Sequence, residues 1–380
     1  MFRRILAVAA VLVAGVSGPS PSPSAAESPR PVSVPVGPFI RYVDVSVATA
    51  WVTAGANRSG VDDLAISNPA YPRSWLAAMT RMQKPIVDSL ETQGLYGTRV
   101  IVDQQVTVNG LLWDHTWVDG QPTPRDVHGY GAYPGWIPDR QLTDRTPPTS
   151  PTRARIAGGV DAPGYTGAGG VTAWAYDTAE QAVARGDAGK VVEFSFNTTL
   201  PVAAAPREAD WVEVRNNHDE ALYVNRRDVS LSTTAATGAA VVARARRFLG
   251  LAYLWAGTSG FGYDCSGFTH EVYASFGIEI PRDADAQAAA AGNPAYTGGL
   301  QKGSAVGSWV ATSADLDPGD LVFFATDSGY IHHVGIYSGL VDGHPMMINS
   351  PHTGSSIEEV PIDSATWGKE FVGGGRFLTG

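Results

Sequence analysis

Apolar and polar residues alternate along several short stretches in the N-terminal part of the chain, a pattern typical of strands with one buried face. One stretch starts at Arg41 and continues as YVDVSVATAWV; a longer one reads LYGTRVIVDQQVTVNGLLWDHTWVDG and contains Asn-Gly and Asp-Gly turn signals. Between them the spacing of apolar residues predicts a helix over 73–92 with a break at Pro85, on Trp75, Leu76, Met79 and Met82. Together these segments predict a strand-rich domain with a helical insertion over 40–147.

A fainter copy of this order follows in TTLPVAAAPREADWVEVRNNHDEALYVNRRDVSL. It predicts a second strand-rich domain over 153–233, separated from the first by the Thr/Pro/Arg-rich stretch 143–155. Short strands joined by closely spaced turn signals are typical of small barrels, so we expect two small β-barrels.

The composition changes after Ser232, where a Thr/Ala/Gly linker leads into the amphipathic segment AAVVARARRFLG. Its apolar stripe predicts a helix that packs Val241, Ala245, Phe248 and Leu249 inward. Helical patterns are followed by the strand patterns LVFFA, HHVGIYSG and PMMINS. This order predicts an α+β domain with an antiparallel sheet over 238–380.

The N-terminal residues have the layout of a secretory signal peptide. Two arginines precede an apolar run from Ile5 to Val16, and Ser24-Ala25-Ala26 supplies small residues for cleavage. The run is shorter than the roughly 20 apolar residues that span a bilayer, and no comparable run follows. We therefore expect a signal peptide over 1–26, a Pro/Ser-rich linker over 27–39, and a secreted protein with no stable membrane span.

The net charge of −10 argues against a nucleic-acid partner. No HExxH motif or pair of cysteines is present, and His332 and His333 are neighbours on a predicted strand, so their rings diverge. We therefore expect no metal and no cofactor, and a monomer.

The single cysteine of the chain lies in YLWAGTSGFGYDCSGF. Exported proteins that use cysteine structurally carry it in pairs, so Cys265 is either a buried inert thiol, an intermolecular bridge or a reactive group. It begins the apolar-periodic segment CSGFTHEVYASFG, which places it at a helix N-terminus. The helix dipole and free N–H groups there favour the nucleophilic thiolate and an oxyanion on the attacked carbonyl.

A thiol nucleophile needs a base, and the strand HHVGIYSG begins with two histidines. Alternate residues of a strand face opposite sides, so His333 shares a face with Gly335 and has clear space in front of its ring. His332 shares a face with Val334 and Ile336 and points to the other side. His333 is the predicted base.

A third polar residue should orient the imidazole, and the next strand, MMINSPH, offers Asn349 and His352. Asn349 would complete a Cys-His-Asn arrangement, a variant of the catalytic triad. His352 is the alternative.

The motifs DCSGF, PGDLVFF, HHVGIY and MINSP, in this order, resemble the NlpC-type cell-wall cysteine endopeptidases. The resemblance implies a papain-like catalytic domain. YLWAGTSGFGYDCSGF and IPRDADAQ resemble in particular the γ-D-glutamyl-L-diamino acid endopeptidases, which release dipeptide units from peptidoglycan stem peptides. Those members carry two bacterial SH3-like domains ahead of the catalytic one, and YGTRV and YPGWIPDRQL resemble the first of them.

The resemblance implies Cys265 as nucleophile, His333 as base and Asn349 as third residue. It also implies that Tyr253 lies near the oxyanion and the scissile carbonyl. The two neighbours of the cysteine are implied to line the substrate site, namely Asp264 and Ser266.

Asp283, in PRDAD, matches an acidic residue that holds the free amino group of the first L-alanine of the stem peptide. A buried ammonium without a carboxylate partner costs several kcal/mol, so this contact selects trimmed peptides. Tyr133 matches a tyrosine of the first SH3-like domain that closes the same pocket, with Tyr130 as its rival. Two positions depart from the pattern: Ala284 replaces a common serine, and Thr98 stands where relatives tend to have glutamate.

These observations predict a secreted cysteine endopeptidase that hydrolyses the bond from γ-D-glutamate to an L-diamino acid in stem peptides with a free N-terminal L-Ala. One alternative is an amidase or acyltransferase on the same scaffold. The other is a wall-binding protein with an inactive catalytic domain.

Overall fold

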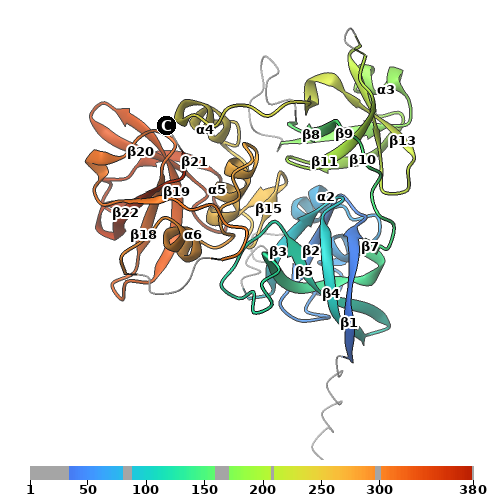
Figure 1. Cartoon of the computed structure of the whole chain (residues 1–380), viewed down its shortest axis with the longest axis horizontal. Coiled ribbons are helices and arrows are strands. Elements are labelled where there is room, and N and C mark those ends of the chain that lie inside the picture. The colour runs from blue at the N-terminus through green and yellow to red at the C-terminus, as the bar shows by residue number, and fades with distance from the viewer. Residues whose placement is uncertain (1–33, 80–87, 159–170, 207–208, 296–300, 379–380) are drawn as a thin grey trace, which may run out of the picture. The chain divides into compact units, whose positions relative to one another are not determined.

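The computed structural model describes residues 34–79, 88–158, 171–206, 209–295 and 301–378, and residues from Ser33 onward form one unit (Figure 1). The predicted signal peptide lies outside the described residues. No helix in the described ranges is both long enough and apolar enough to cross a membrane.

The first domain is built on a seven-stranded antiparallel sheet. Its strands, in spatial order, are β3 (Leu90–Leu95), β2 (Val47–Trp51), β6 (Ala132–Pro138), β5 (Leu111–Asp119), β4 (Arg99–Val108), β1 (Val34–Val43) and β7 (Leu142–Thr143). The predicted Asn-Gly turn joins β4 to β5, where Asn109 and Gly110 have φ of 52° and 79°. Two successive positive φ values give the turn twist that matches a two-residue hairpin.

The second domain repeats this topology. Its strands, in spatial order, are β10 (Lys190–Ser195), β9 (Thr172–Tyr176), β13 (Ala221–Asn225), β12 (Trp211–Arg215), β11 (Thr199–Ala204), β8 (Arg153–Ile156) and β14 (Val229–Ser230). This is the order of the first sheet with every strand replaced by the one seven places later in the chain, so the predicted internal repeat is confirmed. One short helix, α3 (Ala179–Ala184), accompanies the second sheet.

Two predictions near the N-terminus, one of a linker and one of a strand, need correction. The linker predicted over 27–39 is too long, because β1 already begins at Val34, which pairs with Gln105 of β4. A register shift between Pro35 and Phe39 lets prolines, which lack an N–H donor, lie within this strand. The strand predicted from Arg41 is interrupted at residues 44–46, because Asp44 turns to the second domain and accepts a hydrogen bond from Asn217 (3.0 Å).

The helix predicted over 73–92 is also wrong in extent. Two short helices, α1 (Asp63–Ile66) and α2 (Pro72–Ala78), occupy the insertion, and residues 80–87 lie outside the described ranges. Trp75 is fully buried and drives α2 onto the core, as its spacing suggested. Leu90 instead begins β3 and pairs with Trp51 of β2, so a strand partner distant in sequence overrides the helical pattern.

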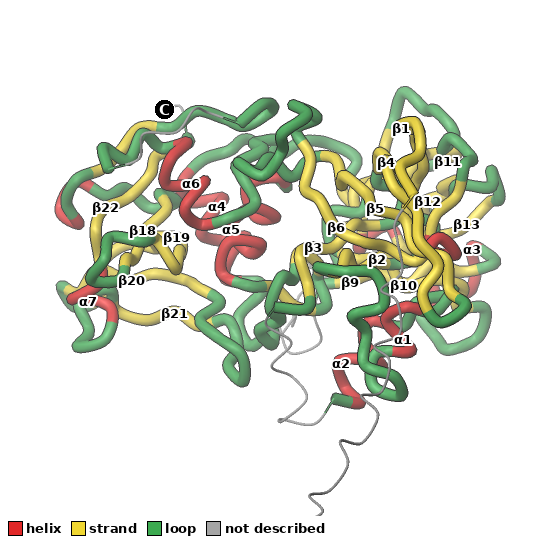
Figure 2. The backbone as a smooth tube through the Cα atoms, turned by 90° about the horizontal axis from the view of Figure 1, so that it is seen from below, coloured by secondary structure: helices red, strands yellow, loops and turns green. Residues whose placement is uncertain are grey.

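The C-terminal domain is the predicted α+β unit, with a six-stranded antiparallel sheet. The strands lie in the order β17 (Ser308–Val310), β22 (Phe371–Arg376), β18 (Leu321–Ala325), β19 (Ile331–Val341), β20 (His344–Asn349) and β21 (Glu358–Pro361). The helices α4 (Gly238–Arg246), α5 (Cys265–Ala274) and α6 (Ala284–Ala290) gather beside this sheet (Figure 2). A short hairpin, β15 (Thr258–Ser259) with β16 (Gly262–Tyr263), precedes α5, and α7 (Trp367–Glu370) precedes β22.

Alternation along the sheet separates two cores. Phe323 and Ile336 face the helices and pack in the same cluster as Phe248 and Phe268. Residues one position away, such as Phe324, pack in a second cluster together with Trp367. The period of two therefore decides which strand residues meet the helices and which meet α7.

The first domain is fixed directly to the segment that precedes Cys265. The backbone N–H of Thr258 donates to the side chain of Gln93 (3.1 Å), and the Thr258 hydroxyl donates to the Gln93 carbonyl (3.0 Å). The backbone N–H of Arg282 donates to the Pro122 carbonyl at 3.0 Å. The loop between β5 and β6 is thereby held against the start of α6, so the first domain packs directly on the C-terminal domain.

Candidate active site

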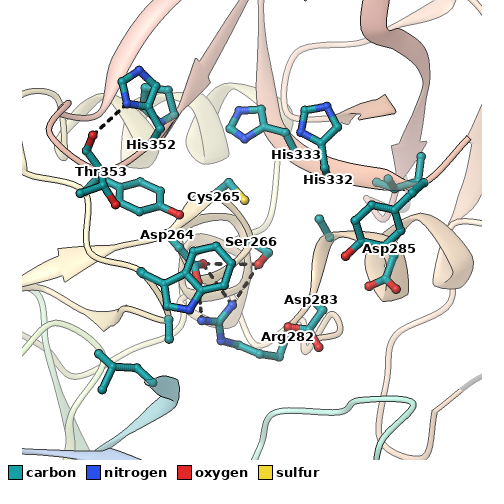
Figure 3. A pocket seen from close by; sticks show the side chains of 18 of the residues that line it. Asp264, Cys265, Ser266, Arg282, Asp283, Asp285, His332, His333, His352 and Thr353 are labelled. Carbon is teal, nitrogen blue, oxygen red and sulfur yellow. Dashed lines mark hydrogen bonds and ion pairs between the residues drawn. The ribbon is translucent and has the colours of Figure 1, made fainter. Parts of the chain in front are cut away.

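Cys265 is the first residue of α5, as predicted, and Asp264 caps that helix. The Asp264 carboxylate accepts a hydrogen bond from the Gly267 N–H at 2.6 Å. A Cβ at Gly267 would lie 2.1 Å from the Gly257 carbonyl oxygen, so this glycine permits the close approach of the preceding loop. Cys265 is only partly exposed, and its sulfur lies beside the start of β19, which carries His332 and His333 (Figure 3).

His333 lies on β19 and is held by two neighbours. Its Nε2 is 3.0 Å from Oδ1 of Asn349, and its ring stacks on Trp367 with centroids 4.6 Å apart. The amide oxygen only accepts hydrogen bonds, so Nε2 donates and Nδ1 keeps its lone pair. A Cβ at Gly335 would lie 3.2 Å from the Cβ of Asn349, so this glycine lets β20 bring the amide close to the ring.

The other histidines near the site have different partners. His352 is exposed at the cavity rim, and its Nδ1 lies 3.0 Å from the Thr353 carbonyl oxygen. The described hydrogen bond to the His333 ring thus comes from Asn349 and not from His352. His332 lines the same cavity, with its ring centroid 6.4 Å from that of His333 and its Nε2 3.3 Å from a carboxylate oxygen of Glu370. The prediction that His332 points to the other side of the strand is therefore wrong, because a register shift between β18 and β19 interrupts the alternation at this position.

Burial keeps both reacting groups uncharged in the substrate-free site. Burial raises the pKa of the Cys265 thiol to about 12, and the negative charge of Asp264 adds to this shift. Burial lowers the pKa of His333 to about 3, although its hydrogen bond to Asn349 acts in the opposite direction. The prediction that the helix N-terminus lowers the thiol pKa is therefore wrong for this state, because desolvation outweighs the backbone N–H groups.

The buried neutral His333 makes the native state sensitive to acid. Between pH 6.5 and about 3 the unfolded chain binds a proton at this position and the native state does not, so the free energy of unfolding falls as pH falls, by up to roughly 1.4 kcal/mol per pH unit. We expect the urea midpoint of His333→Gln to drop less than that of the parent protein over this range. Equal drops in both proteins would contradict the assignment.

Asp264 and Ser266 line the cavity, as predicted, but an arginine engages both. The Arg282 guanidinium donates to the Asp264 carboxylate at 2.7 and 3.1 Å and to the Ser266 hydroxyl at 2.9 Å. Its side chain is almost completely buried, so it fixes the start of α5 rather than offering a free charge. Tyr253 lines the cavity close to Cys265. Burial raises the pKa of the Tyr253 hydroxyl, and the negative charge of a thiolate at Cys265 raises it further.

Asp283 and Tyr133 meet in the cavity, although they are far apart in sequence. The Tyr133 hydroxyl donates to one carboxylate oxygen of Asp283 (3.2 Å), and the Thr123 hydroxyl lies 3.4 Å from the other. Burial raises the pKa of Asp283 to about 6, against the lowering effect of Arg282. Tyr130 packs against Trp117 and does not line this cavity, so the structure brings Tyr133 and not Tyr130 to Asp283.

The first domain also contributes an acidic residue that the sequence did not indicate. Glu91, on β3, lines the cavity and forms a bidentate ion pair with Arg125, one bond of which is 2.9 Å long. The Arg125 guanidinium carbon also lies 5.3 Å from the centroid of the Tyr133 ring. Thr98 itself does not line the cavity, and the acidic residue from the first domain that does so is Glu91, on the strand β3.

All these groups surround one cavity of about 830 Å³, large enough for a short peptide. Its described lining runs from Glu91 and Tyr133 in the first domain, past Cys265, to Trp367 and Glu370 in the catalytic domain. A partly exposed sulfur, an imidazole with a free lone pair and a buried carboxylate therefore share one space.

Comparison with known proteins agrees with this geometry. The NlpC/P60 family model matches residues 250–376. A γ-D-glutamyl-L-lysine dipeptidyl-peptidase of Bacillus cereus is 34% identical over 89% of this chain and 90% of its own, and one of Bacillus subtilis is 31% identical over 86% and 94%. The crystal structure of an NlpC/P60 family protein from Bacillus cereus covers 90% of this chain and 100% of its own with a TM-score of 0.70 and 31% identity. The chain belongs to the NlpC/P60 family.

Proposed function

We propose that the protein is a secreted cysteine endopeptidase that hydrolyses the bond between γ-D-glutamate and an L-diamino acid in peptidoglycan stem peptides with a free N-terminal L-Ala. The observation that carries this proposal is one cavity with Cys265 and His333 at its centre and Asp283 with Tyr133 at one end. The names of the two Bacillus relatives support the same bond. We also propose that the two seven-stranded domains are SH3-like and that residues 1–26 direct export.

The chemistry follows from the uncharged resting pair. Nδ1 of His333 accepts the thiol proton as the Cys265 sulfur attacks the γ-carbonyl carbon, and the tetrahedral oxyanion lies near the N-terminus of α5 and Tyr253. The imidazolium then returns the proton to the leaving α-amine of the diamino acid, and a thioester remains. Water, activated by the same imidazole, hydrolyses the thioester and releases the dipeptide.

Asp283 supports selection of the free amine. A carboxylate buried beside a tyrosine and a threonine hydroxyl is a suitable partner for an ammonium that loses its water on binding. A lactyl-linked or acylated N-terminus has no charge to offer in return. The site thus favours peptides already cut from the glycan.

Mass spectrometry of products tests the proposal. L-Ala-γ-D-Glu-L-Lys and its diaminopimelate counterpart should yield L-Ala-γ-D-Glu and the diamino acid, and the N-acetylated peptides should be cleaved at least about a hundredfold more slowly. Equal cleavage of blocked and free peptides would instead favour an amidase acting on intact murein. No cleavage of either would favour a wall-binding protein.

Replacing Asn349 should slow turnover without weakening substrate binding. Asn349→Ala removes the hydrogen bond that fixes the His333 tautomer, so kcat should fall about ten- to a hundredfold, equivalent to roughly 1–3 kcal/mol, with KM little changed. His352→Ala serves as the matched control, because the described side-chain hydrogen bond of His352 goes to Thr353 and not to His333. Steady-state kinetics of both variants give the two kcat values. A lower kcat for His352→Ala than for Asn349→Ala would make His352, and not Asn349, the third residue.

A further inference from the structure

The leaving group of the proposed reaction has to lie on the His333 side of the cavity. The imidazole that takes the thiol proton hands it to the leaving amine, so that nitrogen lies next to the ring. The remainder of the diamino acid then contacts the residues around the ring that line the cavity. These include Trp367, stacked on His333, together with His332 and Glu370.

The cavity lining contains enough carboxylates without a cationic partner to bind two cationic groups of the substrate. Five carboxylates occur among its described lining residues: Glu91, Asp264, Asp283, Asp285 and Glu370. The two guanidiniums there are already used, since Arg125 pairs with Glu91 and Arg282 with Asp264. Three carboxylates therefore have no arginine or lysine partner within the described chain, and one of them, Asp283, faces the amine end.

The two remaining carboxylates differ in position. Asp285 lies two residues after Asp283 in the first turn of α6, and its negative charge acts on Asp283 directly. Glu370 ends α7, and its described ion-pair partner is the imidazole of His332, the neighbour of His333, at 3.3 Å. Its side chain is 39% exposed, so it has a free face toward the cavity.

We propose that Glu370 binds the side-chain ammonium of the diamino acid, so that the site selects leaving groups with a cationic side chain. The proposal rests on the proposed function and names the residue that recognises the leaving diamino acid. The exposed edge of Trp367 offers an apolar surface for the methylene chain that carries the ammonium. The His332 imidazole, 3.3 Å from this carboxylate, holds it in place.

The test compares L-Ala-γ-D-Glu-L-Lys with the same peptide ending in L-norleucine, whose side chain is similar in shape and carries no charge. The full-length protein should prefer the lysine peptide by about ten- to a hundredfold in kcat/KM, the effect of one charge-assisted hydrogen bond. In Glu370→Gln this ratio should fall to near one. In Asp285→Asn, the positional control, the ratio should stay as in the parent protein.

Three results would overturn the proposal. One is a ratio near one in the parent protein; another is an unchanged ratio in Glu370→Gln, including an equal loss on both peptides, which would show that Glu370 only supports His332 and the fold. A ratio lost in Asp285→Asn would move the ammonium site to α6. If the parent protein cleaves neither peptide, the proposed function itself fails, and this outcome is distinct from cleavage without selectivity.

Discussion

The Cys265→Ser variant is expected to lose at least about four orders of magnitude in kcat on stem peptides, because the group that attacks the carbonyl is replaced by a weaker nucleophile. Burial already holds the thiol protonated and His333 neutral, so the proton must move during the attack itself. A serine hydroxyl gives up its proton far less readily to the same imidazole. Single-turnover measurements by mass spectrometry give the rate constants of both proteins.

Substrate binding supplies the control for this variant. Serine differs from cysteine in one atom, and the Asp283 end of the cavity is unaffected, so calorimetry should show that the free-amine peptide still binds. Activity within about tenfold of the parent protein would exclude Cys265 as the nucleophile. Slow alkylation of Cys265 at neutral pH would not distinguish an inactive binding protein from an enzyme, because burial alone raises the pKa of this thiol. Only the measured rate of substrate turnover distinguishes the two.

The parts of the site that could be predicted are those that depend on local pattern. Cys265 starts an apolar-periodic segment, and it does begin a helix; His333 does lie on the predicted strand. Both statements need only the periods of 3.6 and 2. The position of His332 could not be predicted in this way, because a register shift in β19 places it in the same cavity as His333. The choice between Asn349 and His352 needed more, because it depends on where β20 ends and which side chain reaches the ring.

The parts that could not be predicted depend on contacts between segments that are far apart in sequence. Arg282 belongs to the motif PRDAD, yet its role depends on two contacts that the motif does not show. Its guanidinium donates hydrogen bonds to the Asp264 carboxylate and to the hydroxyl of Thr92 on β3. Glu91 lies within a segment whose apolar spacing suggested a helix. The pairing of β3 with β2 decided its structure and turned Glu91 into the cavity. The raised pKa of the Cys265 thiol could not be predicted for the same reason, since burial is a property of the assembled fold.

Asp283→Asn is expected to lower kcat/KM for free-amine peptides by about 10²- to 10⁴-fold, because a buried ammonium loses its charged partner at a cost of roughly 3–5 kcal/mol. The Tyr133 and Thr123 hydroxyls remain near the amide but carry no charge. The variant should therefore lose its discrimination between free and N-acetylated peptides. Asp285→Asn, which alters the neighbouring carboxylate, should keep that discrimination.

The pH profile distinguishes this role from a purely structural one. The pKa of Asp283 is raised to about 6, so in the parent protein the carboxylate becomes protonated as pH falls below that value, and kcat/KM for free-amine peptides should fall with it. His333, with its pKa lowered to about 3, stays neutral over the same range and cannot cause the decline. Asp283→Asn has no carboxylate to protonate, so its profile should be flat from pH 7 to about 5. If the variant kept the parent profile and its preference for free amines, another group would have to bind the N-terminus, and Asp283 would be a buried acid with no part in choosing the substrate.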